Sequence, residues 1–136
     1  MIKRIAVIFG IVLVVVGILG FIPGITTFAP DVDHGRLLGI FAVDTMHDMV
    51  HIFTGAIAVW MGLTGEAASR SYFRAVGIAY GIVALLGFGY GNAPLFGMMA
   101  NNTADAALHV VIALVALVLG FGHLVERYEH RSHHPA

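Results

Sequence analysis

The chain alternates long apolar runs with short polar stretches, and this pattern sets the predicted fold. Four apolar runs stand out, at residues 5–22, 49–63, 72–91 and 104–124. A helix of roughly 20 apolar residues crosses a bilayer core of about 30 Å. The pattern therefore predicts an all-α, polytopic membrane protein whose four transmembrane helices fill the single domain 1–136.

Capping and breaking residues place the ends of these helices. Pro23 ends the first helix, because proline cannot continue a helical hydrogen-bond ladder. Asp44 or Thr45 caps the second helix, and Thr103 caps the fourth. The basic start of the first run also resembles a signal peptide. Its apolar part is longer than most signal-peptide cores and no small-residue cleavage site follows, so we interpret it as a transmembrane helix.

The segments between the helices are polar and of unequal length. The first connection, residues 25–43, is the longest, and its apolar part at 37–41 predicts a short interfacial helix or re-entrant turn. Residues 64–71 form a predicted short turn, and residues 92–102 form the last connection. A polar, histidine-rich tail covers residues 126–136.

Composition agrees with a membrane class. The hydrophobic fraction is 59%, only 11% of residues are charged, and mean hydropathy is +0.91. The net charge of −1 and the lack of a basic stripe give no reason to expect nucleic acid. No cysteine is present, which excludes disulfides, thiolate ligands and thiol nucleophiles.

The distribution of basic residues predicts the orientation in the membrane. Only Arg36 lies in the first or last connection. The N-terminus, the middle turn and the tail carry the rest: Lys3, Arg4, Arg70, Arg74, Arg127 and Arg131. Basic residues favour the cytoplasmic side. We therefore expect both termini to be cytoplasmic, in a bacterial cytoplasmic membrane.

The two halves of the chain are related by an internal repeat, from about 5–64 to about 72–124. Three residues of the first half recur 58 positions later: Gly39, Thr45 and His51 become Gly97, Thr103 and His109. Both halves start on the same side of the membrane, so the predicted arrangement is two helical hairpins in a pseudo-twofold four-helix bundle.

The repeat brings ionisable residues to the outer ends of the second and fourth helices. His47 and His51 lie on one face of the second helix, and Asp105 and His109 on one face of the fourth, each pair four residues apart. Three imidazoles and a carboxylate suit zinc, or less specifically iron, copper or manganese. The nearby side chains that could orient such ligands are Asp44, Asp48 and Asn102.

Other interpretations of the same residues stay open. The cluster can be a purely structural, hydrogen-bonded latch between helices. Alternatively, His51 and His109 can be axial ligands of a haem or another tetrapyrrole. Four methionines near the cluster fit either soft copper ligation or apolar gap-filling: Met46, Met49, Met98 and Met99. The tail histidines can bind adventitious metal or form a solvated end: His123, His130, His133 and His134.

No catalytic constellation accompanies the cluster. The sequence has no serine–histidine–acid set, phosphate loop or row of membrane carboxylates, so an enzyme or a proton-driven transporter is not supported. The pattern favours a binding or structural membrane protein. Its predicted partners are the lipid bilayer and either further copies of the chain or a larger membrane complex in which it is an accessory subunit.

The paired motifs resemble those of a bacterial family of small four-helix membrane proteins, the domain-of-unknown-function family numbered 4383. The family's HNxxH-like motif matches at His47 and His51, and its DNxxH-like motif at Asp105 and His109. The resemblance covers about residues 5–124. It implies the four-helix membrane fold and no particular activity.

Overall fold

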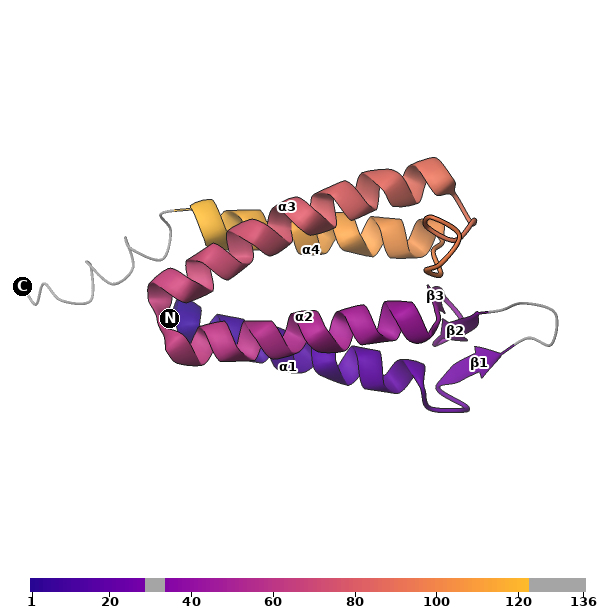
Figure 1. Cartoon of the computed structure of the whole chain (residues 1–136), viewed down its shortest axis with the longest axis horizontal. Coiled ribbons are helices and arrows are strands. Elements are labelled where there is room, and N and C mark those ends of the chain that lie inside the picture. The colour runs from indigo at the N-terminus through magenta and orange to yellow at the C-terminus, as the bar shows by residue number, and fades with distance from the viewer. Residues whose placement is uncertain (29–33, 123–136) are drawn as a thin grey trace, which may run out of the picture.

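The computed structural model describes residues 1–28 and 34–122, and this part of the chain is mostly helical. Its helices are α1 (Ile2–Gly20), α2 (Thr45–Thr64), α3 (Glu66–Tyr90) and α4 (Thr103–Phe121). α1 packs mainly along α2, and α3 packs mainly along α4. The molecule is therefore an elongated bundle of two helix pairs (Figure 1).

Three of the helices, α1, α3 and α4, are long and apolar enough to cross a membrane. Large apolar side chains on them face outwards, with Leu85 75% and Leu114 59% exposed. Such exposure suits contact with lipid chains rather than water. α2 is of similar length, but His47, Asp48 and His51 in its first two turns lower its hydropathy. The prediction of a membrane-like helical protein is thus confirmed, and three of the four predicted spans are candidates among the described residues.

Small residues allow the first helix pair to pack closely. A Cβ added to Gly10 on α1 would collide with the carbonyl oxygen of Gly55 on α2, and the reverse holds as well. The backbones can approach this closely only because both positions lack a side chain. Between the two pairs, aromatic rings meet edge to face, with the Phe9 and Phe73 centroids 5.6 Å apart.

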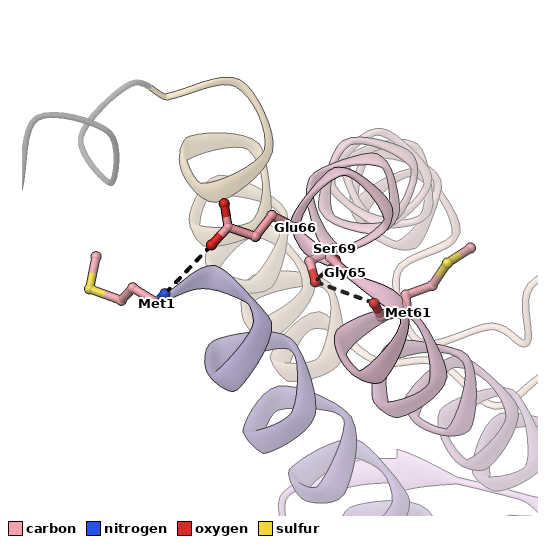
Figure 2. A network of polar contacts seen from close by, with 5 residues as sticks. All are labelled: Met1, Met61, Gly65, Glu66 and Ser69. Atoms are coloured by element: carbon pink, nitrogen blue, oxygen red, sulfur yellow. Dashed lines mark hydrogen bonds and ion pairs between the residues drawn. The ribbon is translucent and has the colours of Figure 1, made fainter. Parts of the chain in front are cut away.

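The N-terminus and the junction between α2 and α3 lie at the same end of the bundle (Figure 1). The Met1 amino group lies 4.0 Å from the Glu66 carboxylate (Figure 2). Ser69 donates its hydroxyl to the carbonyl of Gly65 at 2.8 Å and, at 3.4 Å, to that of Met61. The Ser69 contacts join the start of α3 to the end of α2, and the Met1 contact joins the N-terminus to α3.

This junction corrects the predicted turn at residues 64–71. Only Gly65 separates the two helices, and α3 begins at Glu66 instead of near residue 72. Polar residues suggested a turn, but they form the first turns of α3. Ser69 is fully buried there, and its hydroxyl bonds back to the preceding turn instead of interrupting the helix.

The opposite end carries a small antiparallel sheet in the order β1-β2-β3. Its strands are β1 (Thr26–Phe28), β2 (Gly35–Leu37) and β3 (Phe41–Val43). The predicted alternative of a short helix at 37–41 is therefore wrong, because these residues end β2, turn at 38–40 and begin β3. The all-α class becomes mostly helical. Leu38 and Gly39 have positive φ values of 53° and 73°. Two successive residues with positive φ form the tight turn that joins β2 to β3.

The N-cap of α2 agrees with the prediction, and that of α4 differs from it by one residue. Asp44 is the N-cap of α2, which is one of the two predicted residues. Asn102, not Thr103, is the N-cap of α4, because its side chain accepts from the amide of Asp105. α1 ends at Gly20, two residues before the predicted end. The tail with its histidines lies outside the described residues.

Candidate functional site

Three of the predicted site residues come together at the sheet-bearing end of the bundle. His47 and His51 lie one turn apart on α2, and His109 faces them from α4. Their side chains are only 4%, 7% and 5% exposed. One ring nitrogen from each lies within 4.8 Å of the others, a group that could hold a metal ion.

Hydrogen bonds fix the orientation of His47. Its Nδ1 lies 3.0 Å from the carbonyl oxygen of Ala100, and because a carbonyl only accepts, Nδ1 carries the proton. In a neutral ring, Nε2 then holds a lone pair. That nitrogen lies 3.0 Å from Nε2 of His51. A histidine that ligates a metal usually donates its other ring N–H to a carbonyl or carboxylate, which fixes the orientation of the ring. His47 has this arrangement, with the Ala100 carbonyl as the acceptor.

The other two rings are not fully paired. Nδ1 of His51 and Nδ1 of His109 are buried and have no hydrogen-bond partner among the described residues. An unsatisfied buried polar group costs about 1–3 kcal/mol, so native proteins rarely leave one without a partner. The protein's own contacts therefore do not account for the whole cluster.

Two cavities adjoin the rings. The first, of about 40 Å³, is lined by the three histidines together with Tyr80 and Met99. It has room for an ion or a water molecule. The second, of about 160 Å³, is lined by the same histidines, by Asp48 and Asp105, and by aliphatic side chains. Two carboxyl groups thus lie beside the rings, and an ionised carboxylate there would lower the cost of burying a cation.

Asp105, the fourth predicted ligand, lies outside the three-histidine group. Its Oδ2 accepts from the amide of Asn102 at 3.1 Å and from the amide of Ala42 on β3 at 3.0 Å. With Asn102 it forms a reciprocal capping box at the start of α4. Asp105 therefore positions α4 against the sheet, and ligation by its carboxylate stays a prediction.

The predicted supporting residues have different roles. Asp44 accepts from the amide of His47 at 2.8 Å and from the amide of Ala100 at 2.6 Å, so it holds both ends of the His47–Ala100 contact. Asn102 donates to the carbonyl of Ile40 at 2.8 Å. Asp48 is 3% exposed and packs against Gly20 of α1.

The arrangement is suited to binding a metal ion. Two imidazole nitrogens on one tetrahedral zinc ion lie about 3.3 Å apart, because each bond is about 2.0–2.1 Å long. The 3.0 Å between His47 and His51 is close to that value. Both cavities are well below the roughly 300 Å³ of the smallest pockets for drug-sized ligands. Within one chain the tetrapyrrole alternative has little space, and it stays untested.

Two residues of the site carried little signal in the sequence. Tyr80 places its ring edge-on to His109, with centroids 5.2 Å apart, but in the sequence it is one aromatic residue within an apolar run. Ala100 contributes only its backbone, which no side-chain pattern reveals. Met99 stood out as one of the methionines near the cluster, without a sign that it would line the inner cavity.

The fold and the site define a small, membrane-like helical protein with a buried histidine cluster that could bind metal. The chain belongs to the family described as Domain of unknown function (DUF4383), which it matches over residues 3–122. No curated protein and no solved structure matches it. The resemblance that the paired motifs indicated is confirmed.

Proposed function

We propose that this protein is a non-enzymatic, integral membrane protein that binds one transition-metal ion at His47, His51 and His109. One observation carries the proposal. Three buried imidazoles converge, with one ring nitrogen of each within 4.8 Å of the other two. An ion that binds the Nε2 lone pairs of His47 and His51 accounts for the 3.0 Å between these two nitrogens.

The proposal includes α2 as the fourth transmembrane helix. Its 20 residues give a length of about 30 Å, which matches the bilayer core. α2 packs along α1, and its polar side chains His47, Asp48 and His51 are buried in the bundle. An ionisable residue in a membrane helix is tolerated when it faces the protein interior.

The proposed orientation has both termini in the cytoplasm of a bacterial cell. Among the described residues, Lys3, Arg4, Arg70 and Arg74 lie at one end of the bundle, while Arg36 lies on β2 at the other. The basic end favours the cytoplasmic side. The histidine cluster then lies near the outer surface of the cytoplasmic membrane.

The internal repeat is also part of the proposal, and local geometry supports it. The turn at Leu38 and Gly39 has a counterpart at Phe96 and Gly97, with φ values of 53° and 71°. The N-caps Asp44 and Asn102 are likewise 58 positions apart, and the side chain of each accepts from the backbone amide three residues further along the chain. Equivalent turns and caps would bring His51 and His109 to equivalent places in two hairpins.

A structural latch is the second candidate, favoured by the 3.0 Å contact between His47 and His51 and by the bond from His47 to Ala100. In that case water in the 40 Å³ cavity satisfies the remaining nitrogens. The two candidates differ in one property that can be measured directly, namely the metal content of the purified protein.

Metal analysis of protein purified in detergent without chelator tests the proposal. We expect about one ion per chain, lost in His51→Ala and in His109→Ala. The matched control replaces three tail histidines, His130, His133 and His134, by glutamine, and should retain the ion. If the tail variant loses the metal and the cluster variants retain it, the metal site is refuted.

A further inference from the structure

A second candidate site adjoins the cluster on the sheet-bearing end of the molecule. A groove of about 600 Å³ is lined there by three methionines, Met46, Met49 and Met98, together with His34 and Asp44. Thioether and imidazole groups are thus concentrated in one surface groove that lies outside the three-histidine site.

Gap-filling in a core does not explain two of these methionines. Met46 is 49% exposed and Met98 is 65% exposed, so neither fills an internal space. Their thioethers remain accessible to a ligand from outside. Thioether sulfur is a soft donor that selects Cu(I) over hard or borderline divalent ions.

Neighbouring residues of the chain line the groove and the cavity of the buried histidines. Met98 lines the groove and its neighbour Met99 lines the inner cavity. Asp44 lines the groove as well, and it accepts from the amides of His47 and Ala100. Ala100 in turn accepts from the ring of His47. Asp44 in the groove wall is therefore hydrogen-bonded to the backbone of His47, which is a ligand of the inner site, and to the residue that orients its ring.

We propose that this groove is the entry site for a monovalent soft metal ion, Cu(I), which then passes to His47, His51 and His109. The inference rests on the proposed metal site and names the ion that the site takes. The transfer is a ligand exchange in which imidazole nitrogens replace thioether sulfurs. No electron is transferred and no bond within the protein changes, because the ion arrives and remains as Cu(I).

The test compares metal uptake by full-length protein in detergent under a reductant. The probes are Cu(I), followed by competition with a chromogenic Cu(I) chelator, Ag(I) as a redox-inert analogue, and Zn(II). The test variant combines Met46→Leu, Met49→Leu and Met98→Leu, which nearly conserve volume. The control is Met61→Leu on the same helix, towards its other end. A thermal unfolding curve verifies that each variant is folded.

The expected result is Cu(I) and Ag(I) uptake that is slower in the triple variant by about tenfold or more, a factor taken from the loss of metal affinity or activity when partners of metal ligands are mutated. The final stoichiometry and the Met61→Leu uptake rate should match the wild type. Uptake as fast in the triple variant as in the wild type, with binding still lost in His109→Ala, overturns the entry site alone. Preference for Zn(II) over Cu(I) overturns it as well. If no probe binds in a histidine-dependent way, the proposed function fails and the entry site fails with it.

Discussion

His47 and Asp105 each bond the backbone segment that precedes the other's helix. His47 on α2 donates to the carbonyl of Ala100 at 3.0 Å, and Asp105 on α4 accepts from the amide of Ala42 at 3.0 Å. The two contacts connect α2 and α4 reciprocally. The two side chains differ in the atoms that remain for binding a metal ion. His47 retains a second ring nitrogen, whereas the bonded carboxylate oxygen of Asp105 already accepts from two amides.

The two roles of His47 can be separated by substitution. His47→Asn places an amide N–H near the position of Nδ1, so it keeps the bond to Ala100 but removes the Nε2 ligand. His47→Ala removes both. We expect both variants to lose the bound metal, and only His47→Ala to lose in addition about 1–3 kcal/mol of metal-free stability, because it leaves the buried Ala100 carbonyl unpaired. Metal content and thermal unfolding in chelator measure the two effects, and equal metal-free stability of the two variants would contradict this role of His47.

Asp105 is expected to act through its hydrogen bonds. Asp105→Asn keeps one side-chain oxygen that can accept from Ala42 and Asn102, so stability and metal content should stay close to wild type. Asp105→Ala removes the acceptor of the Asn102 and Ala42 amides and should cost about 1–3 kcal/mol, because the buried Ala42 amide is left unpaired. Unfolding curves and metal analysis of the two variants are the measurement. Loss of metal in a stably folded Asp105→Asn variant would instead support ligation by the carboxylate.

The sequence predicted the helices well because a membrane span needs a long apolar run, and such a run is visible without tertiary information. It did not predict the three-residue strands, since β2 and β3 are too short to show an alternating pattern. The start of α3 was missed because Glu66 and Ser69 are polar, and only the contact of Ser69 with the preceding turn shows that they are helical.

For the candidate site, helical spacing paired His47 with His51, and the repeat added His109. The role of Asp105 was harder to predict because a carboxylate in the first turn of a helix suits both a ligand and a capping box. The spacing from Asn102 to Asp105 did contain the capping signal. Contacts that use only the backbone of Ala42 and Ala100 depend on the tertiary fold, so no local pattern could have shown them.

Close packing of α1 on α2 predicts an unequal response to adding one methyl group. Gly10→Ala places a Cβ against the carbonyl of Gly55 and should cost about 1–3 kcal/mol through forced separation of the backbones. Gly81→Ala on α3 is the control, because its added Cβ would lie 3.9 Å from the nearest atom, the Cβ of Ala113. That variant should stay within about 0.5 kcal/mol of wild type. Thermal unfolding in detergent compares them, and equal losses would argue against this helix contact.

The orientation is testable because the chain has no cysteine of its own. Single cysteines can be placed at exposed sites, with Ala67→Cys beside the α2–α3 junction and Ala93→Cys and Thr27→Cys at the sheet-bearing end. In intact cells, a membrane-impermeant maleimide should label Cys variants of Ala93 and Thr27 and leave that of Ala67 unlabelled until the membrane is permeabilised. The reverse pattern would place the histidine cluster on the cytoplasmic side.

The two histidines at equivalent positions of the proposed repeat should be energetically coupled. The ring centroids of His51 and His109 lie 6.1 Å apart, and both rings border the same cavities. Replacing either by alanine leaves the remaining ligands of the ion incomplete, so each single variant should lose the full stabilisation that the metal gives. The double variant has no further metal binding to lose, and its loss should be clearly smaller than the sum of the two single losses.

A double-mutant cycle measured by thermal unfolding in detergent, with and without chelator, distinguishes the two candidate functions. For a metal site, coupling is present without chelator and disappears when chelator removes the ion, because ligand binding stabilises only the folded state. For a hydrogen-bonded latch, coupling has the same size in both conditions, on the order of 0.5–3 kcal/mol for contacting residues. Strict additivity in both conditions would mean that His51 and His109 do not share a site, and it would exclude the metal site at these two residues.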